Sequence, residues 1–252
     1  MTEPDPGVAI RPPGDEHDMQ GRTVAAGRGW DWIAAGYALF RKQPGIWILA
    51  AVVLGVIFIV ISMIPLLGTL ANALLFPIFG GGLMLGCRNL EQGGKLEIDD
   101  LFAGFKQKTG DLVMIGAFNL LGWVVIAFAV FVVVGGGVFM GMMRGGDAGA
   151  GISIASMLLA MLLVAGLSLP LYMATWFAPA LIVLGDAAPG AALKASFFAC
   201  LRNWLPFLVY GIVLLLLCVL AAIPAGLGFL VLMPVVIASV YTAYRDIFEA
   251  AR

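Results

Sequence analysis

Few side chains in this sequence have the chemistry of a catalytic or metal-binding site. The chain has one histidine, His17, and three cysteines (Cys87, Cys200 and Cys218) with neither disulfide nor metal-ligand spacing. Catalysis or metal binding that needs two histidines from one chain is therefore excluded. No phosphate-binding glycine loop and no nucleophile–histidine–acid set is found. We expect no cofactor, and an enzyme is the least favoured class of function.

The fifteen acidic residues all lie in tails, loops or amphipathic segments, outside the long apolar runs. Transporters coupled to protons or cations usually place an ionisable group at membrane depth. The distribution of carboxylates argues against that mechanism, although it leaves open a substrate site built from backbone and hydroxyl groups.

Five side chains within the apolar runs are the candidates for a binding cavity: Asn72, Asn119, Tyr172, Thr175 and Trp176. The two asparagines are the most polar, and as a pair they could instead hydrogen-bond between helices, worth roughly 0.6 kcal/mol in a membrane. The other three lie between Pro170 and Pro179, where a broken helix would free backbone carbonyls. The alternative for the tyrosine and tryptophan is an anchor at the membrane interface.

A second set of candidates consists of cations at the ends of amphipathic segments, namely Arg41, Lys42, Lys106, Lys108 and Arg202. Each could bind anionic lipid headgroups, contributing about 1 kcal/mol near such a surface. The alternative is that these cations only set the topology. We expect membrane lipids as partners, a membrane protein or a second copy of the chain as further partners, and no nucleic acid.

The composition is that of a polytopic membrane protein. Hydrophobic residues make up 62% of the chain and charged residues 12%, against about half and about a quarter in soluble domains. The mean hydropathy of +1.04 agrees. The sequence therefore predicts an all-α fold whose helices cross a bilayer.

Uncharged runs define six spans. The run between Lys42 and Arg88 holds two spans of about 20 residues with a turn at Pro65. The run 152–184 is too long for one span and too short for two, so we interpret it as one tilted, broken helix, with a re-entrant segment as the alternative. The predicted spans lie near 46–64, 68–87, 112–134, 152–184, 205–222 and 227–244. They form one domain over 29–248, with a disordered tail at 1–28, a glycine-rich loop at 135–151 and a short C-terminal tail at 245–252.

An amphipathic segment precedes each pair of spans, and the markers around it recur. Pro77 and Pro234 each lie 11 residues before an arginine, Arg88 and Arg245, and the two arginines open similar tripeptides. These spacings favour three repeats, each an interfacial helix and a helical hairpin, over chance similarity between hairpins. The expected units are about 29–90, 96–185 and 190–248.

Positive charge predicts the orientation. Thirteen of the fourteen cations fall on the side of the termini and the connecting segments, and only Arg144 falls on the other. The positive-inside rule then puts both termini in the cytoplasm of a bacterial inner membrane.

The stretch Gly29-Trp-Asp-Trp-Ile-Ala-Ala-Gly-Tyr-Ala-Leu-Phe-Arg-Lys-Gln-Pro-Gly45 with its six-helix body resembles an uncharacterised family of proteobacterial inner-membrane proteins. Their signature is this Gly-Trp, Leu-Phe, Pro opening. More distantly, the chain resembles the membrane domain that accompanies some glycerophosphodiester phosphodiesterases. A separate catalytic domain is absent and there is one histidine, so the resemblance implies a fold and a compartment but no activity or site residues.

The sequence favours a non-enzymatic inner-membrane protein that acts through lipid or protein partners, for instance in assembly or envelope homeostasis. The alternative is a permease or channel for a small or lipid-like solute, and a membrane enzyme comes third. A continuous polar cavity between the three units would favour the permease, and a tightly packed, dry centre would exclude it.

Overall fold

The computed structural model describes residues 21–143 and 154–249, and within these ranges the regular elements are all helices. Six are long and apolar enough to cross a membrane, which confirms the predicted number: Pro44–Ser62, Leu67–Glu91, Thr109–Met140, Ser156–Gly185, Trp204–Ala222 and Phe229–Glu249. The predicted tail before residue 21 and the loop at 144–153 lie outside the described residues.

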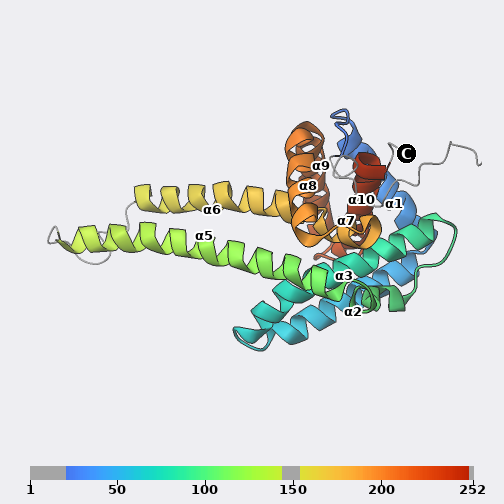
Figure 1. The fold of residues 1–252 in the computed structure, drawn as a ribbon, viewed down its shortest axis with the longest axis horizontal. Coiled ribbons are helices and arrows are strands. Elements are labelled where there is room, and N and C mark those ends of the chain that lie inside the picture. The colour runs from blue at the N-terminus through green and yellow to red at the C-terminus, as the bar shows by residue number, and fades with distance from the viewer. Residues whose placement is uncertain (1–20, 144–153, 250–252) are drawn as a thin grey trace, which may run out of the picture.

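The spans form three hairpins: α2 (Pro44–Ser62) with α3 (Leu67–Glu91), α5 (Thr109–Met143) with α6 (Ile154–Thr175), and α9 (Trp204–Ala222) with α10 (Phe229–Tyr244). Figure 1 shows α5 and α6 side by side as a long arm that extends away from the other helices. About half of the α3 span (50%) and of the α10 span (56%) is buried, against 17% or less in the other four. The second helices of the first and third hairpins are therefore the central ones.

The segments before the hairpins pack against neighbouring units. These segments are α1 (Arg28–Lys42), the short pair η2 (Ile98–Phe102) and α4 (Ala103–Lys106), and α8 (Pro189–Arg202). The η2–α4 pair lies on α3, and α8 lies on α6 and on α7 (Ala178–Gly185), so each contacts the hairpin that precedes it. Helix α1 has no preceding hairpin among the described residues and packs on α10 and α9, in the last one. Each segment thus packs on the preceding hairpin, and the first segment packs on the last hairpin, which agrees with three units. The repeat itself stays a prediction.

The fourth span is broken between α6 and α7, as interpreted from its length and prolines. Pro179 stands in the first turn of α7, where its missing N–H costs nothing. At the break, the Phe177 backbone N–H donates to the Ser196 hydroxyl (3.0 Å), which donates to the Met173 carbonyl (2.7 Å). A side chain of α8 thus satisfies backbone groups that water cannot reach at this depth.

Two segments differ from their predicted structure. Helix α5 continues through Gly135–Gly137 to Met143, in the first part of the predicted loop. It stays helical because apolar surroundings leave its backbone no other hydrogen-bond partners, and α6 packs alongside it. The predicted C-terminal tail begins instead as η4 (Arg245–Glu249), a π-helical turn that continues α10 and is largely buried.

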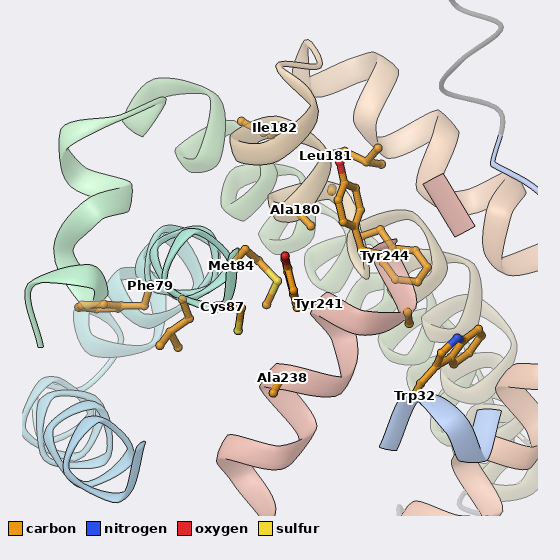
Figure 2. Packing of buried hydrophobic residues seen from close by; sticks show 14 of the residues in the cluster. Trp32, Phe79, Met84, Cys87, Ala180, Leu181, Ile182, Ala238, Tyr241 and Tyr244 are labelled. Carbon is orange, nitrogen blue, oxygen red and sulfur yellow. The ribbon is translucent and has the colours of Figure 1, made fainter. Parts of the chain in front are cut away.

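The core lies where the hairpins meet, at the ends of the spans that adjoin the connecting segments. It joins α1, α3, α7, α8 and α10, with Trp32 and Tyr241 each 1% exposed. Figure 2 shows Tyr241 of α10 reaching toward Met84 of α3, with Ala180 of α7 close by. Toward their opposite ends the spans carry large exposed apolar side chains, such as Ile59 (66%) and Val219 (59%), which the bilayer would cover.

Candidate functional site

All five predicted cavity residues line one cavity of about 520 Å³. Asn72 comes from α3, Asn119 from α5, Tyr172 and Thr175 from α6, and Trp176 from the break before α7. Elements of all three predicted units therefore meet here, since α10 supplies the remaining wall. Whether these residues bind a ligand stays a prediction.

The rest of the lining is almost entirely apolar: Ala73, Phe76, Pro77, Gly80, Met84, Ile115, Trp123, Pro179, Ala180, Val236, Ile237 and Val240. Among the described residues of this lining, none is Asp, Glu, Lys, Arg or His. An apolar cavity of about 300–1,000 Å³ with a few placed polar groups is typical of sites for one small molecule.

Glycines on α5 bring the neighbouring helices close on either side of the cavity. A Cβ at Gly116 would lie 2.7 Å from the Ala73 carbonyl of α3, and one at Gly122 would lie 2.5 Å from the Leu171 side chain of α6. Gly80 of α3 differs, because a Cβ there would meet nothing within 4 Å and it lines the cavity.

The polar groups of the lining are held by local hydrogen bonds. The Asn72 Nδ2 donates to Ser62 Oγ (2.8 Å) and lies 3.4 Å from the Phe58 carbonyl, both on α2. Within the described residues no hydrogen bond joins Asn72 to Asn119, so the asparagine pair considered from the sequence is not formed. Thr175 Oγ1 donates to the Leu171 carbonyl of its own helix (3.0 Å).

An ion-pair cluster between α3 and η4 lies beyond the Met84 end of the cavity. Arg245 pairs with Glu91 and, at 3.2 Å, with Glu249, while Arg88 pairs with Glu249 at 3.0 Å. The Tyr241 hydroxyl donates to Glu91 at 2.7 Å. In the sequence, Arg88 and Arg245 stood out only as markers of the repeat, and no partners were predicted for them. Buried Tyr241, which lies beside Met84 (Figure 2), connects this cluster to the end of the cavity.

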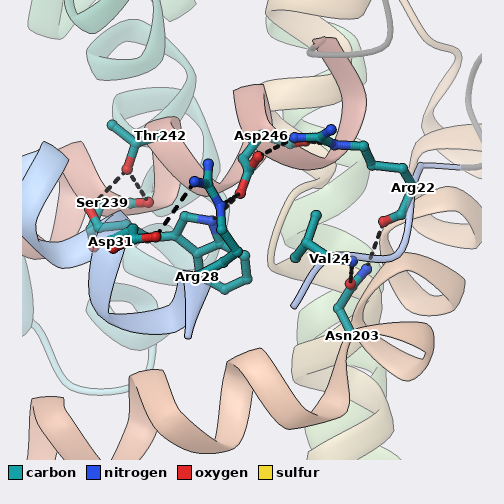
Figure 3. A network of polar contacts seen from close by, with 9 residues as sticks. Arg22, Val24, Arg28, Asp31, Asn203, Ser239, Thr242 and Asp246 are labelled. Carbon is teal, nitrogen blue, oxygen red and sulfur yellow. Dashed lines mark hydrogen bonds and ion pairs between the residues drawn. The ribbon is translucent and has the colours of Figure 1, made fainter. Parts of the chain in front are cut away.

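A second polar cluster, the Asp246 clamp, fixes the segment before α1 (Figure 3). Asp246 of η4 is 6% exposed and accepts from Arg28 Nε (2.7 Å), from Trp32 Nε1 (2.8 Å) and from the Arg22 guanidinium. The Arg28 pKa is raised, first by this hydrogen bond, so the side chain stays charged. Residues 21–28, expected in the tail, are thus bound to the body.

Asn203 completes the clamp. Its side chain, in a residue 1% exposed, accepts from the Val24 N–H (2.8 Å) and donates to the Arg22 carbonyl (3.0 Å). These contacts join residues about 180 to 220 positions apart, so no local pattern in the sequence indicates them.

The five lipid-headgroup candidates do not form one site. Lys42 Nζ donates to the Leu90 carbonyl (3.1 Å), and Lys108 pairs with Asp186, which raises the Lys108 pKa. Arg41 lies 6.0 Å from the centre of the Tyr37 ring. The remaining two, Lys106 and Arg202, are exposed at the ends of α4 and α8. Lys42 and Lys108 thus bind groups of the protein itself, and headgroup binding by the five cations stays a prediction.

Comparison with known proteins supports the membrane assignment. The chain is 29% identical over 255 residues, 91% of its length and 94% of the other's, to a protein of Burkholderia thailandensis named as a probable inner membrane protein. Together with the six apolar helices, this similarity decides the class. The chain is a helical membrane protein. The relative's name also supports the inner membrane as its location.

The comparison is consistent with the resemblance to an uncharacterised inner-membrane family and brings no activity. No family model matches the chain, and no solved structure matches it. The distant likeness to the membrane domain of glycerophosphodiester phosphodiesterases stays a prediction from the sequence.

Proposed function

We propose that this protein is a non-enzymatic inner-membrane protein that holds one lipid-like molecule in the cavity between its hairpins. The cavity itself carries the proposal, because its volume of about 520 Å³ and apolar lining suit one hydrophobic molecule. Such a protein would act through lipid and protein partners, for instance in assembly or envelope homeostasis.

The position of the cavity favours an occupant drawn from the bilayer. Three aromatic lining residues are also exposed: Phe76 (71%), Tyr172 (49%) and Trp123 (36%). All three lie within candidate spans. Lipid would therefore border the cavity, and a hydrophobic molecule could enter without crossing water.

A permease or channel for a lipid-like solute is the second candidate, and the same cavity favours it. It would need a path past Tyr241 and the ion pairs of Glu91 and Arg245. These groups lie beyond Met84, on the side of the connecting segments. Binding without passage is therefore the simpler function for this geometry.

We further propose that the termini and the connecting segments face the cytoplasm, on the strength of the positive-inside rule. Lys95 lies exposed in a connecting segment and Ile223 lies exposed in the turn of the third hairpin. In a chain whose native cysteines are changed to serine, Lys95→Cys should react with a membrane-impermeant maleimide only after cell lysis, and Ile223→Cys should react in intact spheroplasts. The opposite pattern would overturn the orientation.

The binding proposal is tested by filling the cavity from Gly80. Gly80→Leu puts a side chain into open space without meeting the backbone, and it replaces a poor helix former with a good one. Overpacking a site costs about 1–3 kcal/mol, so the amount of co-purified lipid per protein should fall about tenfold or more.

Gly55→Leu is the matched control, because Gly55 of α2 also has nothing within 4 Å and is not part of the cavity lining. Both variants are extracted from native membranes, and bound lipids are measured by native mass spectrometry. Equal lipid retention by wild type, Gly80→Leu and Gly55→Leu would refute the proposal.

A further inference from the structure

The cavity wall contains a hydrogen-bond acceptor without a partner. Asn72 belongs to the lining, and its Oδ1 is buried with no partner among residues 21–143 and 154–249. A buried polar atom left unsatisfied in apolar surroundings is costly, so each such atom in a folded protein requires an explanation.

The hydrogen bonds around Asn72 determine which atom of its amide is the free one. Ser62 Oγ has one proton, which it donates to the Phe58 carbonyl at 2.6 Å. It can therefore only accept from the Asn72 amide 2.8 Å away, and the atom facing Ser62 must be Nδ2. Asn72 Oδ1 is therefore left to accept from another donor. If the nitrogen and oxygen of the amide were exchanged, the hydrogen bond between Asn72 and Ser62 would be lost.

Asn119 approaches the same level of the cavity from α5. Gly116 brings the α5 backbone against Ala73 of α3, and the two helices run in opposite directions as members of successive hairpins. Asn119 lies about one turn after Gly116 along α5. Because α3 runs in the opposite direction, Asn119 lies on the side of the Gly116–Ala73 contact where Asn72 also lies. Two amides therefore mark one end of the cavity, and apart from Tyr172, Thr175 and Trp176 the remainder of its lining is apolar.

The apolar part of the cavity has the length of a lipid chain. From Asn72 to Met84, α3 rises about 18 Å at 1.5 Å per residue. One leaflet of the hydrocarbon core is about 15 Å thick. A single chain whose head lies at the amides would therefore reach Met84.

Resting on the proposed function, we propose that the ligand is an uncharged single-chain lipid with a free hydroxyl group, such as a long-chain alcohol or a monoacylglycerol. The hydroxyl donates to Asn72 Oδ1, and the chain extends along α3 toward Met84. The lining residues carry no Asp, Glu, Lys, Arg or His, so a charged head would lie there unpaired. Because Oδ1 is buried and Nδ2 stays bound to Ser62, the neighbouring apolar side chains, and not the amide, shift to admit the hydroxyl.

The test compares two probes that differ by one donor, 1-hexadecanol and its methyl ether, on the full-length protein in nanodiscs. Wild type should bind the alcohol about tenfold more tightly than the ether, which corresponds to about 1.4 kcal/mol. Asn72→Leu should bind both probes equally. Gly55→Leu, on α2 and outside the cavity lining, should keep the preference for the alcohol.

The outcomes separate this inference from the proposed function. Equal binding of the two probes by wild type, or no binding of either, overturns the hydroxyl assignment whether or not any variant folds. Retained preference in Asn72→Leu overturns the role of Asn72. In each of these cases, if Gly80→Leu loses its lipid and Gly55→Leu does not, the cavity is still supported as a lipid-binding site.

Discussion

Replacing Asp246 with asparagine keeps the shape of the side chain and removes the charge that holds residues 21–28 against η4. Arg22 and Arg28 then lose the carboxylate that they share. Only one oxygen of the amide remains to accept hydrogen bonds from the side chains of Arg22, Arg28 and Trp32. Trp32 Nε1 is the most sensitive of these donors, because its residue is 1% exposed and water cannot replace the lost partner.

The expected loss is smaller than for a fully buried ion pair. Breaking a buried pair costs about 3–5 kcal/mol, but the two guanidinium side chains are 42% and 43% exposed, so solvent screens them. We expect the free energy of unfolding to fall by about 2–3 kcal/mol. For a chain of this size that lowers the melting temperature by roughly 4–12 °C.

The assay is the fraction of detergent-solubilised protein that stays monodisperse after heating, measured by fluorescence-detected size exclusion. Asp31→Asn is the matched control, because Asp31 is 53% exposed and lies 3.4 Å from the same Arg28. It should lose less than about 0.5 kcal/mol. An Asp246→Asn midpoint no lower than that of Asp31→Asn would show that the clamp does not stabilise the fold.

Two further predictions use the same protein. Gly36→Ala would place a methyl group 2.7 Å from the Ser239 backbone nitrogen of α10, so α1 must shift and stability should fall by about 1–3 kcal/mol. Gly45→Ala, with nothing within 4 Å, should leave the melting midpoint unchanged, and equal midpoints for the two variants would contradict the close packing. Burial raises the pKa of Cys200 to about 12, so with Cys200 as the sole cysteine, maleimide at neutral pH should label it only after SDS unfolding. Rapid labelling of the folded protein would contradict its burial.

Much of the architecture could be predicted because a bilayer imposes simple local rules. A run of about 20 apolar residues without charge must form a helix there, since the backbone finds hydrogen bonds nowhere else. The six spans and the break near Pro179 follow from this rule. The glycine-rich loop was predicted too long at its start, because glycine weakens helices in water more than in a membrane hairpin that packs against its neighbour.

The cavity candidates were selected because they are unusual inside apolar runs. Asn72 and Asn119 are amides at membrane depth, and Thr175 lies beside a helix break. The spacing did not indicate that they share one cavity, because this depends on how α3, α5 and α6 cross. Those crossings are set at Gly116 and Gly122, whose missing side chains let neighbouring helices come close.

The sequence by itself determined that this is a membrane protein, how many of its helices in the described residues are long and apolar enough to span a bilayer, and where prolines and cations interrupt them. Each of these properties depends on neighbouring residues and on the thickness of the bilayer. Only the tertiary structure decided that Asp246 holds the segment before α1, that Glu91 pairs with Arg245, and that α3, α5, α6 and α10 enclose one cavity. These features join positions far apart in the chain, where pairing depends on the approach of whole helices and no local pattern records it.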